Sequence, residues 1–200
     1  MQNILELSRQ LNLIDILILI VFLRLVFISF KQGLGVEFFK LLGSLCGLYL
    51  ALHYYFLLAT FLSGFTGSIE PEISFLELIA FVILFAFGYL FFWSVRIVTF
   101  RFMDAEVNSQ FSKWGGCVCA LFRSFLLSSL MLFALVIPGS AYFKDSVRYS
   151  FSGYYFSKVA PATYTFIWES IVSKFNSGEK YNSALYDIFP AEVKQKKKNK

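Results

Sequence analysis

Residues 78–95 read LIAFVILFAFGYLFFWSV, eighteen consecutive residues without a charge. An α-helix rises about 1.5 Å per residue, so a run of this length crosses most of the roughly 30 Å of hydrocarbon in a bilayer. A continuous apolar run also differs from the alternating pattern of a strand in a membrane β-barrel. The stretch therefore predicts a transmembrane helix, which we expect to cover about residues 75–100.

Three further segments are long and apolar, at about residues 13–30, 34–62 and 115–137. The first is not a signal peptide, because no small-x-small cleavage site follows it, and we treat it as a permanent helix. The short connection over residues 30–35 predicts that the first two helices form an antiparallel hairpin. Pro138 and Gly139 end the last segment, since neither residue continues a helix readily.

The composition of the whole chain agrees with a membrane protein. Of its 200 residues 58% are hydrophobic and 16% are charged, and the mean hydropathy is +0.65. A soluble domain has about 45–50% apolar and about 25% charged residues. The net charge of +5 comes from five lysines at the C-terminus, namely Lys194, Lys196, Lys197, Lys198 and Lys200. The rest of the chain is neutral, so we expect no nucleic-acid partner.

These patterns divide the chain into four parts. A short N-terminal segment (1–12) precedes a four-helix transmembrane domain (13–137). Residues 138–175 are rich in aromatic and charged side chains, and we expect one or two amphipathic helices there, divided by Pro161, on the membrane or against the bundle. Residues 176–200 form a polar, lysine-rich tail that we expect to be disordered. The predicted fold is an all-α integral membrane protein with four transmembrane helices and a C-terminal amphipathic helical region.

The loops differ in charge. The connections at 31–35 and 101–114 contain or adjoin Lys and Arg, whereas the loop at 63–74 is acidic and has neither. Cytoplasmic loops carry an excess of Lys and Arg. We therefore expect the first and third loops in the cytoplasm and both termini outside.

Small residues recur at helical spacing in two of the segments. They are Gly43, Gly47 and Ala51 in the second segment and Gly116, Ala120, Ser124 and Ser128 in the fourth. Such stripes let helix backbones approach closely in lipid. We expect them to contact helices of this chain or of a second copy, and a homo-oligomer or a complex with other membrane proteins follows. The alternative is that glycine is simply common in membrane helices.

Four charged residues belong to one half of the membrane if the four segments alternate in direction. They are Arg24, Glu37, Lys40 and Arg123. Charges inside a span are costly and usually face protein or water. In one interpretation Glu37 pairs with Arg123 in a polar pocket that attracts a small anionic solute. In the other, Arg24 and Lys40 extend to the headgroups while Glu37 pairs with Lys40 along its own helix.

Three titratable residues, Asp15, His53 and Glu77, belong to the opposite half. Asp15 opens the first segment, where a carboxylate suits a helix N-terminus at the membrane interface. His53 is followed by Tyr54 and Tyr55, which favours a place in an interfacial aromatic belt. With Arg24, Glu37 and Arg123, Asp15 completes the set of candidate functional residues inside the membrane.

No pattern of a catalytic or metal site is present. The chain has one His and three Cys, and it lacks a Ser/His/Asp set, a metal-ligand spacing and a complete glycine-rich nucleotide loop. We therefore expect no catalytic residue, no cofactor and no metal, and a protein that is not an enzyme.

The order of several short motifs resembles the colicin V production protein (CvpA) family, which consists of small bacterial inner-membrane proteins. The matching motifs are Leu13-Ile14-Asp15, Lys31-Gln32-Gly33 with Glu37, Gly43, His53-Tyr54-Tyr55, and Gly116 with Arg123. The resemblance covers about residues 12–160. It implies a multi-pass protein of the inner membrane that takes part in production or secretion of the toxin colicin V and in envelope homeostasis.

Two other functions fit the residues. A small oligomeric transporter or channel would pass a solute along Arg24, Glu37 and Arg123. A membrane anchor would instead use the lysine tail to recruit anionic lipid or protein.

Overall fold

The computed structural model describes residues 12–29, 32–64, 73–102, 110–148, 150–175 and 181–182. The predictions for the N-terminal segment before residue 12, for the lysines of the tail and for most of the second and third loops lie outside the described residues.

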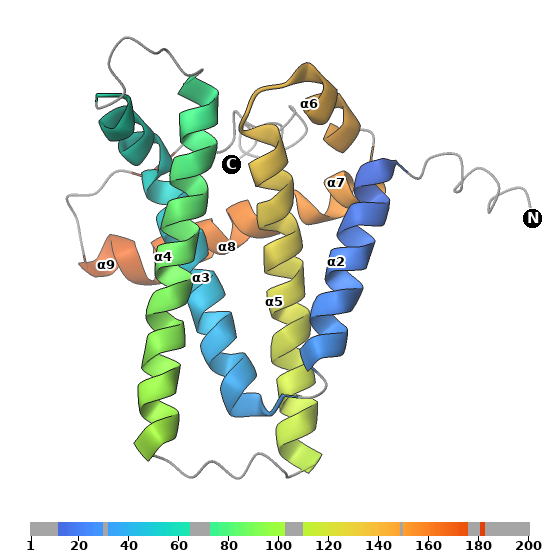
Figure 1. Cartoon of the computed structure of the whole chain (residues 1–200), viewed down its shortest axis with the longest axis vertical. Coiled ribbons are helices and arrows are strands. Elements are labelled where there is room, and N and C mark those ends of the chain that lie inside the picture. Colours follow the sequence, from blue (N-terminus) through green and yellow to red (C-terminus); the bar gives the residue numbers. More distant parts are fainter. Residues whose placement is uncertain are drawn as a thin grey trace, which may run out of the picture.

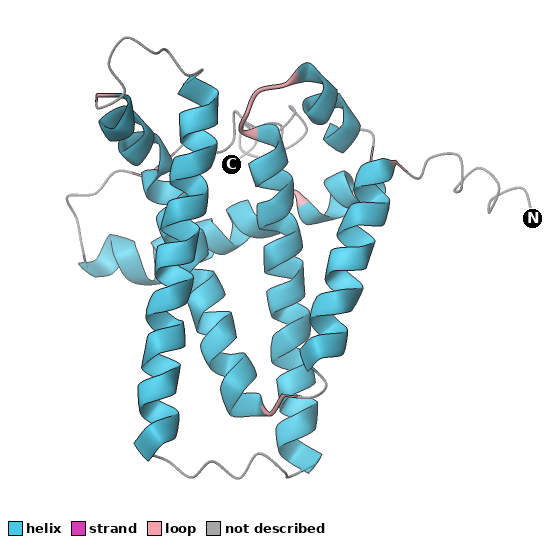
Figure 2. Ribbon diagram, viewed as in Figure 1, coloured by secondary structure: helices cyan, strands magenta, loops and turns pink. Residues whose placement is uncertain are grey.

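Within the described ranges the fold is built from helices and short connections (Figures 1 and 2). The helices are α2 (Leu13–Ser29), α3 (Leu34–Ser63), α4 (Ile73–Phe102), α5 (Gln110–Val136), α6 (Ala141–Arg148), α7 (Phe151–Phe156), α8 (Val159–Ile167), the π-helix η1 (Trp168–Val172) and α9 (Ser173–Phe175). The all-α prediction is confirmed.

Three of these helices are long and apolar enough to cross a membrane. The spanning candidates are Leu34–Ser63, Ser74–Arg101 and Ser112–Val136. Helix α2 is shorter, with 17 residues, which correspond to about 25 Å at 1.5 Å per residue. A fourth span therefore stays a prediction.

Among the described residues, helix α2 packs against α5 and not against α3. The prediction that the first two helices form a hairpin is therefore wrong. Ile18 of α2 lies in an apolar cluster with Leu132 of α5. Lower in the bundle, the rings of Phe22 and Phe125 meet edge to face with centroids 5.1 Å apart. Figure 1 shows α2 beside α5. A short connection sets the direction of the next helix but not its neighbour, and here complementary apolar surfaces select α5.

Glycines bring α3 and α4 into close contact. A Cβ added to Gly88 of α4 would lie 2.7 Å from the Cα of Gly47, and one added to Gly43 would lie 3.3 Å from the carbonyl oxygen of Tyr89. Ala51, one turn beyond Gly47, is fully buried. This stripe therefore faces a helix of the same chain. Gly88 completes the contact. The sequence does not predict this role, because Gly88 lies in a uniformly apolar run without a stripe of small residues.

The second stripe lies where α5 meets the start of α3. A Cβ on Gly116 would lie 2.9 Å from the carbonyl oxygen of Gln32. Ala120 and Ser124, one and two turns further along α5, are fully buried. The small side chains allow the entry to α3 to lie directly on α5.

The segment after α5 packs across the bundle. Helix α5 ends at Val136, and Gly139 follows with φ +78°, a left-handed conformation that suits glycine. Helices α7 and α8 cross the long helices in Figure 1, and the amide of Ala160 donates to Ser129 Oγ of α5 at 2.8 Å.

Pro161 does not divide the C-terminal helices, and that prediction is wrong. Pro161 lies in the first turn of α8, where its missing N–H leaves no intrahelical hydrogen bond unmade. The break comes earlier, at the turn over residues 157–158.

Two residues of the predicted disordered tail are held by the bundle. Asn182 Nδ2 donates to the carbonyl oxygen of Leu52 at 2.8 Å, and the Tyr181 ring lies 5.4 Å from that of Tyr164. These contacts are not predictable from the polar composition of the tail, because they depend on one aromatic ring and one side-chain amide.

Candidate functional site

A buried carboxylate lies where α3 begins. Glu37 occupies the first turn of α3 and is fully buried. The amide of Leu34 donates to Ser112 Oγ of α5 at 3.0 Å, and Gly116 allows the backbone at Gly33 to approach α5 closely. The entry to α3 is thus fixed against α5, and Glu37 faces the interior of the bundle.

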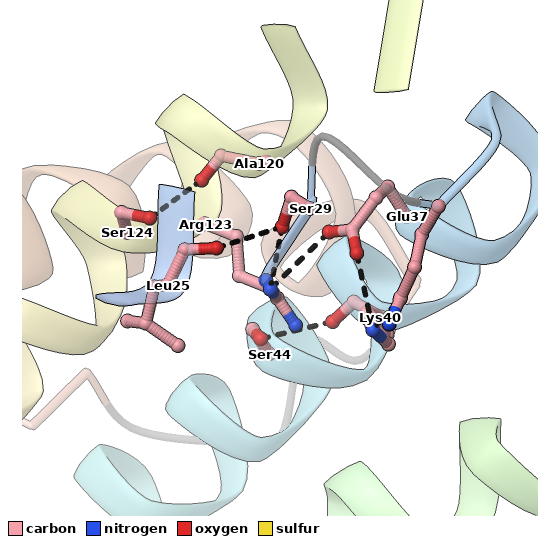
Figure 3. A network of polar contacts seen from close by, with 9 residues as sticks. Leu25, Ser29, Glu37, Lys40, Ser44, Ala120, Arg123 and Ser124 are labelled. Carbon is pink, nitrogen blue, oxygen red and sulfur yellow. Dashed lines mark hydrogen bonds and ion pairs between the residues drawn. The ribbon is translucent and has the colours of Figure 1, made fainter. Parts of the chain in front are cut away.

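Glu37 contacts two cations from different helices. Its Oε1 lies 3.0 Å from Lys40 Nζ, and its Oε2 lies 3.3 Å from Arg123 Nη2. Lys40 also donates to Gln32 Oε1. Both of the pairings considered for Glu37 therefore occur together, as Figure 3 shows. We call Ser29, Glu37, Lys40 and Arg123 the polar network.

Ser29 connects the polar network to α2. Arg123 Nη2 donates to Ser29 Oγ at 3.2 Å, and Ser29 Oγ donates to the carbonyl oxygen of Leu25 at 2.9 Å. Ser29 is fully buried and the Arg123 side chain is 5% exposed. The polar network therefore joins α2, α3 and α5. Ser29 was not among the predicted residues, because a single serine at the end of an apolar run has no distinctive pattern.

Some buried polar atoms at the polar network have no hydrogen-bond partner among the described residues. They are Glu37 Oε2, Arg123 Nε and, further along α5, Ser128 Oγ. The ion pair at 3.3 Å attracts Oε2 electrostatically without making a hydrogen bond. Buried polar groups are normally satisfied, so unused hydrogen-bonding capacity here indicates a centre able to accept water or a polar solute. With two cations and one anion, the centre carries a formal charge of +1 and favours an anion.

Arg24 lies apart from this centre. Its side chain is exposed on α2, and it makes no ion pair within the described part of the chain. The structure thus brings Glu37, Lys40 and Arg123 together and leaves Arg24 on the outer surface.

Asp15 lies in the first turn of α2, as expected, and its carboxylate also contacts a second helix. It is 4% exposed, and its carboxylate accepts from the amides of Asn12 (3.1 Å), Phe151 (3.3 Å) and Ser152 (2.7 Å). Phe151 and Ser152 begin α7, where unpaired N–H groups favour a negative charge. Asp15 therefore fixes the start of α2 to the start of α7.

His53 lies in a cluster of aromatic rings. Its Nδ1 is 2.7 Å from Tyr164 Oη, and its ring stacks on Tyr49 (5.3 Å) and Trp168 (5.4 Å). The partners come from α3, α8 and η1. His53 is half-buried among these rings, and its place in an interfacial aromatic belt stays a prediction.

The described residues do not form a metal site. No three His, Cys, Asp or Glu side chains in the described ranges lie close enough together to hold a metal ion.

Comparison with known proteins places the chain in a family. No curated protein and no solved structure matches it. A family model described as "Colicin V production protein" matches residues 14–161, about three quarters of the chain. The match begins in α2 and ends in the first turn of α8, so it includes Asp15, Glu37 and Arg123. With its apolar helices, the chain is a membrane protein that belongs to the colicin V production protein family.

Proposed function

We propose that this chain is a multi-pass protein of the bacterial inner membrane that supports production or secretion of colicin V and envelope homeostasis without catalysing a reaction. The family match over residues 14–161 carries this proposal. The family suggests a role in colicin V production and is not known as an enzyme family. The inner-membrane location, the multi-pass arrangement, secretion, envelope homeostasis and the non-enzymatic role go beyond the family match and belong to the proposal.

The apolar surface of α2 supports a fourth span. Helix α2 consists mostly of strongly apolar residues. Several of its apolar side chains are exposed, including Leu13 (74% exposed) and Phe27 (68% exposed). Exposed apolar side chains of this number would be unfavourable in water. We propose that α2 crosses the membrane with α3, α4 and α5.

Complementation in a colicin V-producing bacterium tests the function. A strain lacking this gene should release less toxin than the parent, and the intact gene should restore release. Glu37→Gln should restore it poorly, because the carboxylate that holds Lys40 and Arg123 is lost. Arg24→Gln is the matched control and should restore it fully, since Arg24 lies outside the polar network.

Survival of the same strains in deoxycholate is also measured, because it reports on the integrity of the cell envelope. Protein levels in the membrane are compared by immunoblot, so that a folding defect is distinguished from a loss of function. Normal toxin release and normal detergent survival in the deletion strain would contradict the proposal.

A second candidate is a small oligomeric transporter or channel with a polar path along Glu37 and Arg123. Glu37 Oε2, Arg123 Nε and Ser128 Oγ accept or donate no hydrogen bond among the described residues, which favours it, because a path for a polar solute needs polar groups with hydrogen-bonding capacity to spare. Since the small-residue stripes are used within one chain, copies would associate through other faces, such as the exposed apolar surface of α4.

Flux measurements separate the two candidates. Proteoliposomes are loaded with chloride, phosphate, acetate or glutamate, and efflux is followed for the intact chain, for Glu37→Gln and for Arg24→Gln. Efflux that Glu37→Gln abolishes and Arg24→Gln retains supports transport. Absence of efflux for all four anions would contradict it and favour the first candidate.

A further inference from the structure

A cavity opens beside the C-terminal end of α4, where α4 faces the start of α3. Its volume is about 640 Å³, and it is lined by Gln32, Val36, Arg96, Ile97, Phe100 and Arg101. Both helix ends lie at the lower edge of Figure 1. The cavity lies outside the polar network, on the side of α3 that faces α4.

The cavity combines cations with an apolar wall. Arg96 and Arg101 make no ion pair within the described part of the chain. Phe100 packs over Gly35, and its ring meets that of Phe39 edge to face with centroids 6.1 Å apart. A ligand that fits this site therefore needs an anionic group and an apolar part.

A third cation lies next to the cavity. Lys40 and Arg96 both line a narrower adjoining recess, together with Trp93. Lys40 donates to Gln32 Oε1, whose side chain lines the main cavity. Glu37, the carboxylate that neutralises Lys40 in part, is fully buried on the interior side. Among the described residues, positive charge consequently prevails at the cavity.

The depth of the cavity matches the level of lipid phosphates. Helix α4 has 30 residues, about 45 Å at 1.5 Å per residue, which exceeds the roughly 30 Å of hydrocarbon by about 15 Å. Arg96 precedes the last helical residue, Phe102, by six positions, or about 9 Å. That distance places Arg96 near the boundary between hydrocarbon and headgroups. Trp93, which is 45% exposed one turn deeper, suits the same boundary.

We propose that this cavity binds the phosphate group of an anionic membrane phospholipid. Arg96 and Arg101 hold the phosphate, and an acyl chain follows the exposed apolar surface of α4 beside Ile97. Basic pockets between transmembrane helices favour anionic headgroups in this way. An inorganic phosphate shares the anionic chemistry but would leave the apolar wall unused.

Native mass spectrometry of the full-length protein in detergent tests the site. Phosphatidylglycerol and phosphatidylcholine are added in parallel, and their apparent affinities are compared. We expect the intact chain to prefer phosphatidylglycerol. Arg96→Gln and Arg101→Gln should each weaken phosphatidylglycerol binding about five-fold, and the double variant about 25-fold, with little change for phosphatidylcholine.

Arg24→Gln is the matched control, because it removes an exposed basic residue that does not line the cavity. It should leave phosphatidylglycerol binding unchanged. Equal losses in Arg24→Gln and Arg96→Gln would show that only diffuse surface charge attracts the lipid, and would overturn the proposal. The same holds if the double variant keeps the full preference for phosphatidylglycerol.

Competition with inorganic phosphate shows whether the cavity binds a lipid headgroup or free phosphate. We expect millimolar phosphate not to displace phosphatidylglycerol, since the lipid also uses the apolar wall. Displacement by phosphate would overturn the lipid assignment. Size-exclusion profiles confirm that each variant is folded, and the two single variants decide the test if the double variant aggregates.

Discussion

Two buried carboxylates, Asp15 and Glu37, are held in different ways. Asp15 is 4% exposed and accepts from three backbone amides. Glu37 is fully buried and contacts the side chains of Lys40 and Arg123. Backbone donors are fixed by the helices to which they belong, whereas side-chain donors change position by rotation about their own bonds. The comparison indicates that Asp15 joins the starts of two helices through backbone groups, whereas the contacts of Glu37 depend on side chains from α3 and α5.

The two sites also differ in how completely their polar atoms are used. Asp15 satisfies amides at the start of α7. At the polar network, Glu37 Oε2 and Arg123 Nε have no hydrogen-bond partner among the described residues. An unsatisfied buried group costs stability, so selection for stability alone does not account for the polar network. Glu37 Oε2 and Arg123 Nε are the atoms that the proposed transport path would use.

The largest effect should come from Arg123→Leu. This change leaves the Glu37 carboxylate buried without the cation at its Oε2, and breaking a buried pair on one side costs about 3–5 kcal/mol. The free energy of unfolding would be measured in mixed micelles by titration with a denaturing detergent, with tryptophan fluorescence as the signal.

Arg24→Leu serves as the control for Arg123→Leu, because it removes the same charge from an exposed position on α2. It should change the free energy of unfolding far less. Equal effects of the two substitutions would mean that the ion pair with Glu37 contributes no specific stabilisation.

An intermediate effect is expected for Asp15→Ala. The substitution leaves the amides of Phe151 and Ser152 without their acceptor, and hydrogen bonds to charged groups contribute about 1.5–3 kcal/mol. Hydrogen exchange should show loss of protection at these two amides, while α3 remains protected. Asp15→Asn keeps one acceptor oxygen and should fall between the wild type and Asp15→Ala. Unchanged exchange at α7 in Asp15→Ala would refute the role of Asp15 in fixing the start of α7 to α2.

The smallest effect should come from Lys40→Gln. The Lys40 side chain is 14% exposed and pairs with Glu37 along one helix, and partly solvated pairs of this kind contribute about 1 kcal/mol or less. The same unfolding titration measures it. A loss as large as that of Arg123→Leu would show that the two cations of Glu37 are equivalent, contrary to their different burial.

The hydropathy pattern was sufficient to predict the long helices. Residues 34–62 were expected and α3 covers Leu34–Ser63, while residues 75–100 were expected and α4 covers Ile73–Phe102. These boundaries follow from the length of the apolar runs, which is a local property of the sequence. The pairing of Glu37 with Arg123 was also among the expected alternatives, because both lie at a similar depth in their helices.

Contacts between distant segments were not predictable from the same pattern. The packing of α2 on α5, the hydrogen bond from Arg123 to Ser29, and the contact of Asp15 with α7 each depend on which helix faces are complementary. A serine or aspartate at the end of an apolar run has the same local pattern whether it faces lipid, water or a helix terminus. The prediction that Pro161 divides the C-terminal helices is wrong for a related reason. The effect of a proline depends on the turn of the helix in which it lies, and Pro161 lies in the first turn of α8.

A double-mutant cycle on Glu37 and Arg123 tests most directly whether these two residues act as a pair at the centre of the bundle. The free energy of unfolding is measured for Glu37→Gln, for Arg123→Leu and for the combined variant. We predict that the combined loss is smaller than the sum of the single losses by about 1–3 kcal/mol, because the second substitution removes a charge that the first has left unpaired. Losses that add within about 0.5 kcal/mol would contradict the pairing.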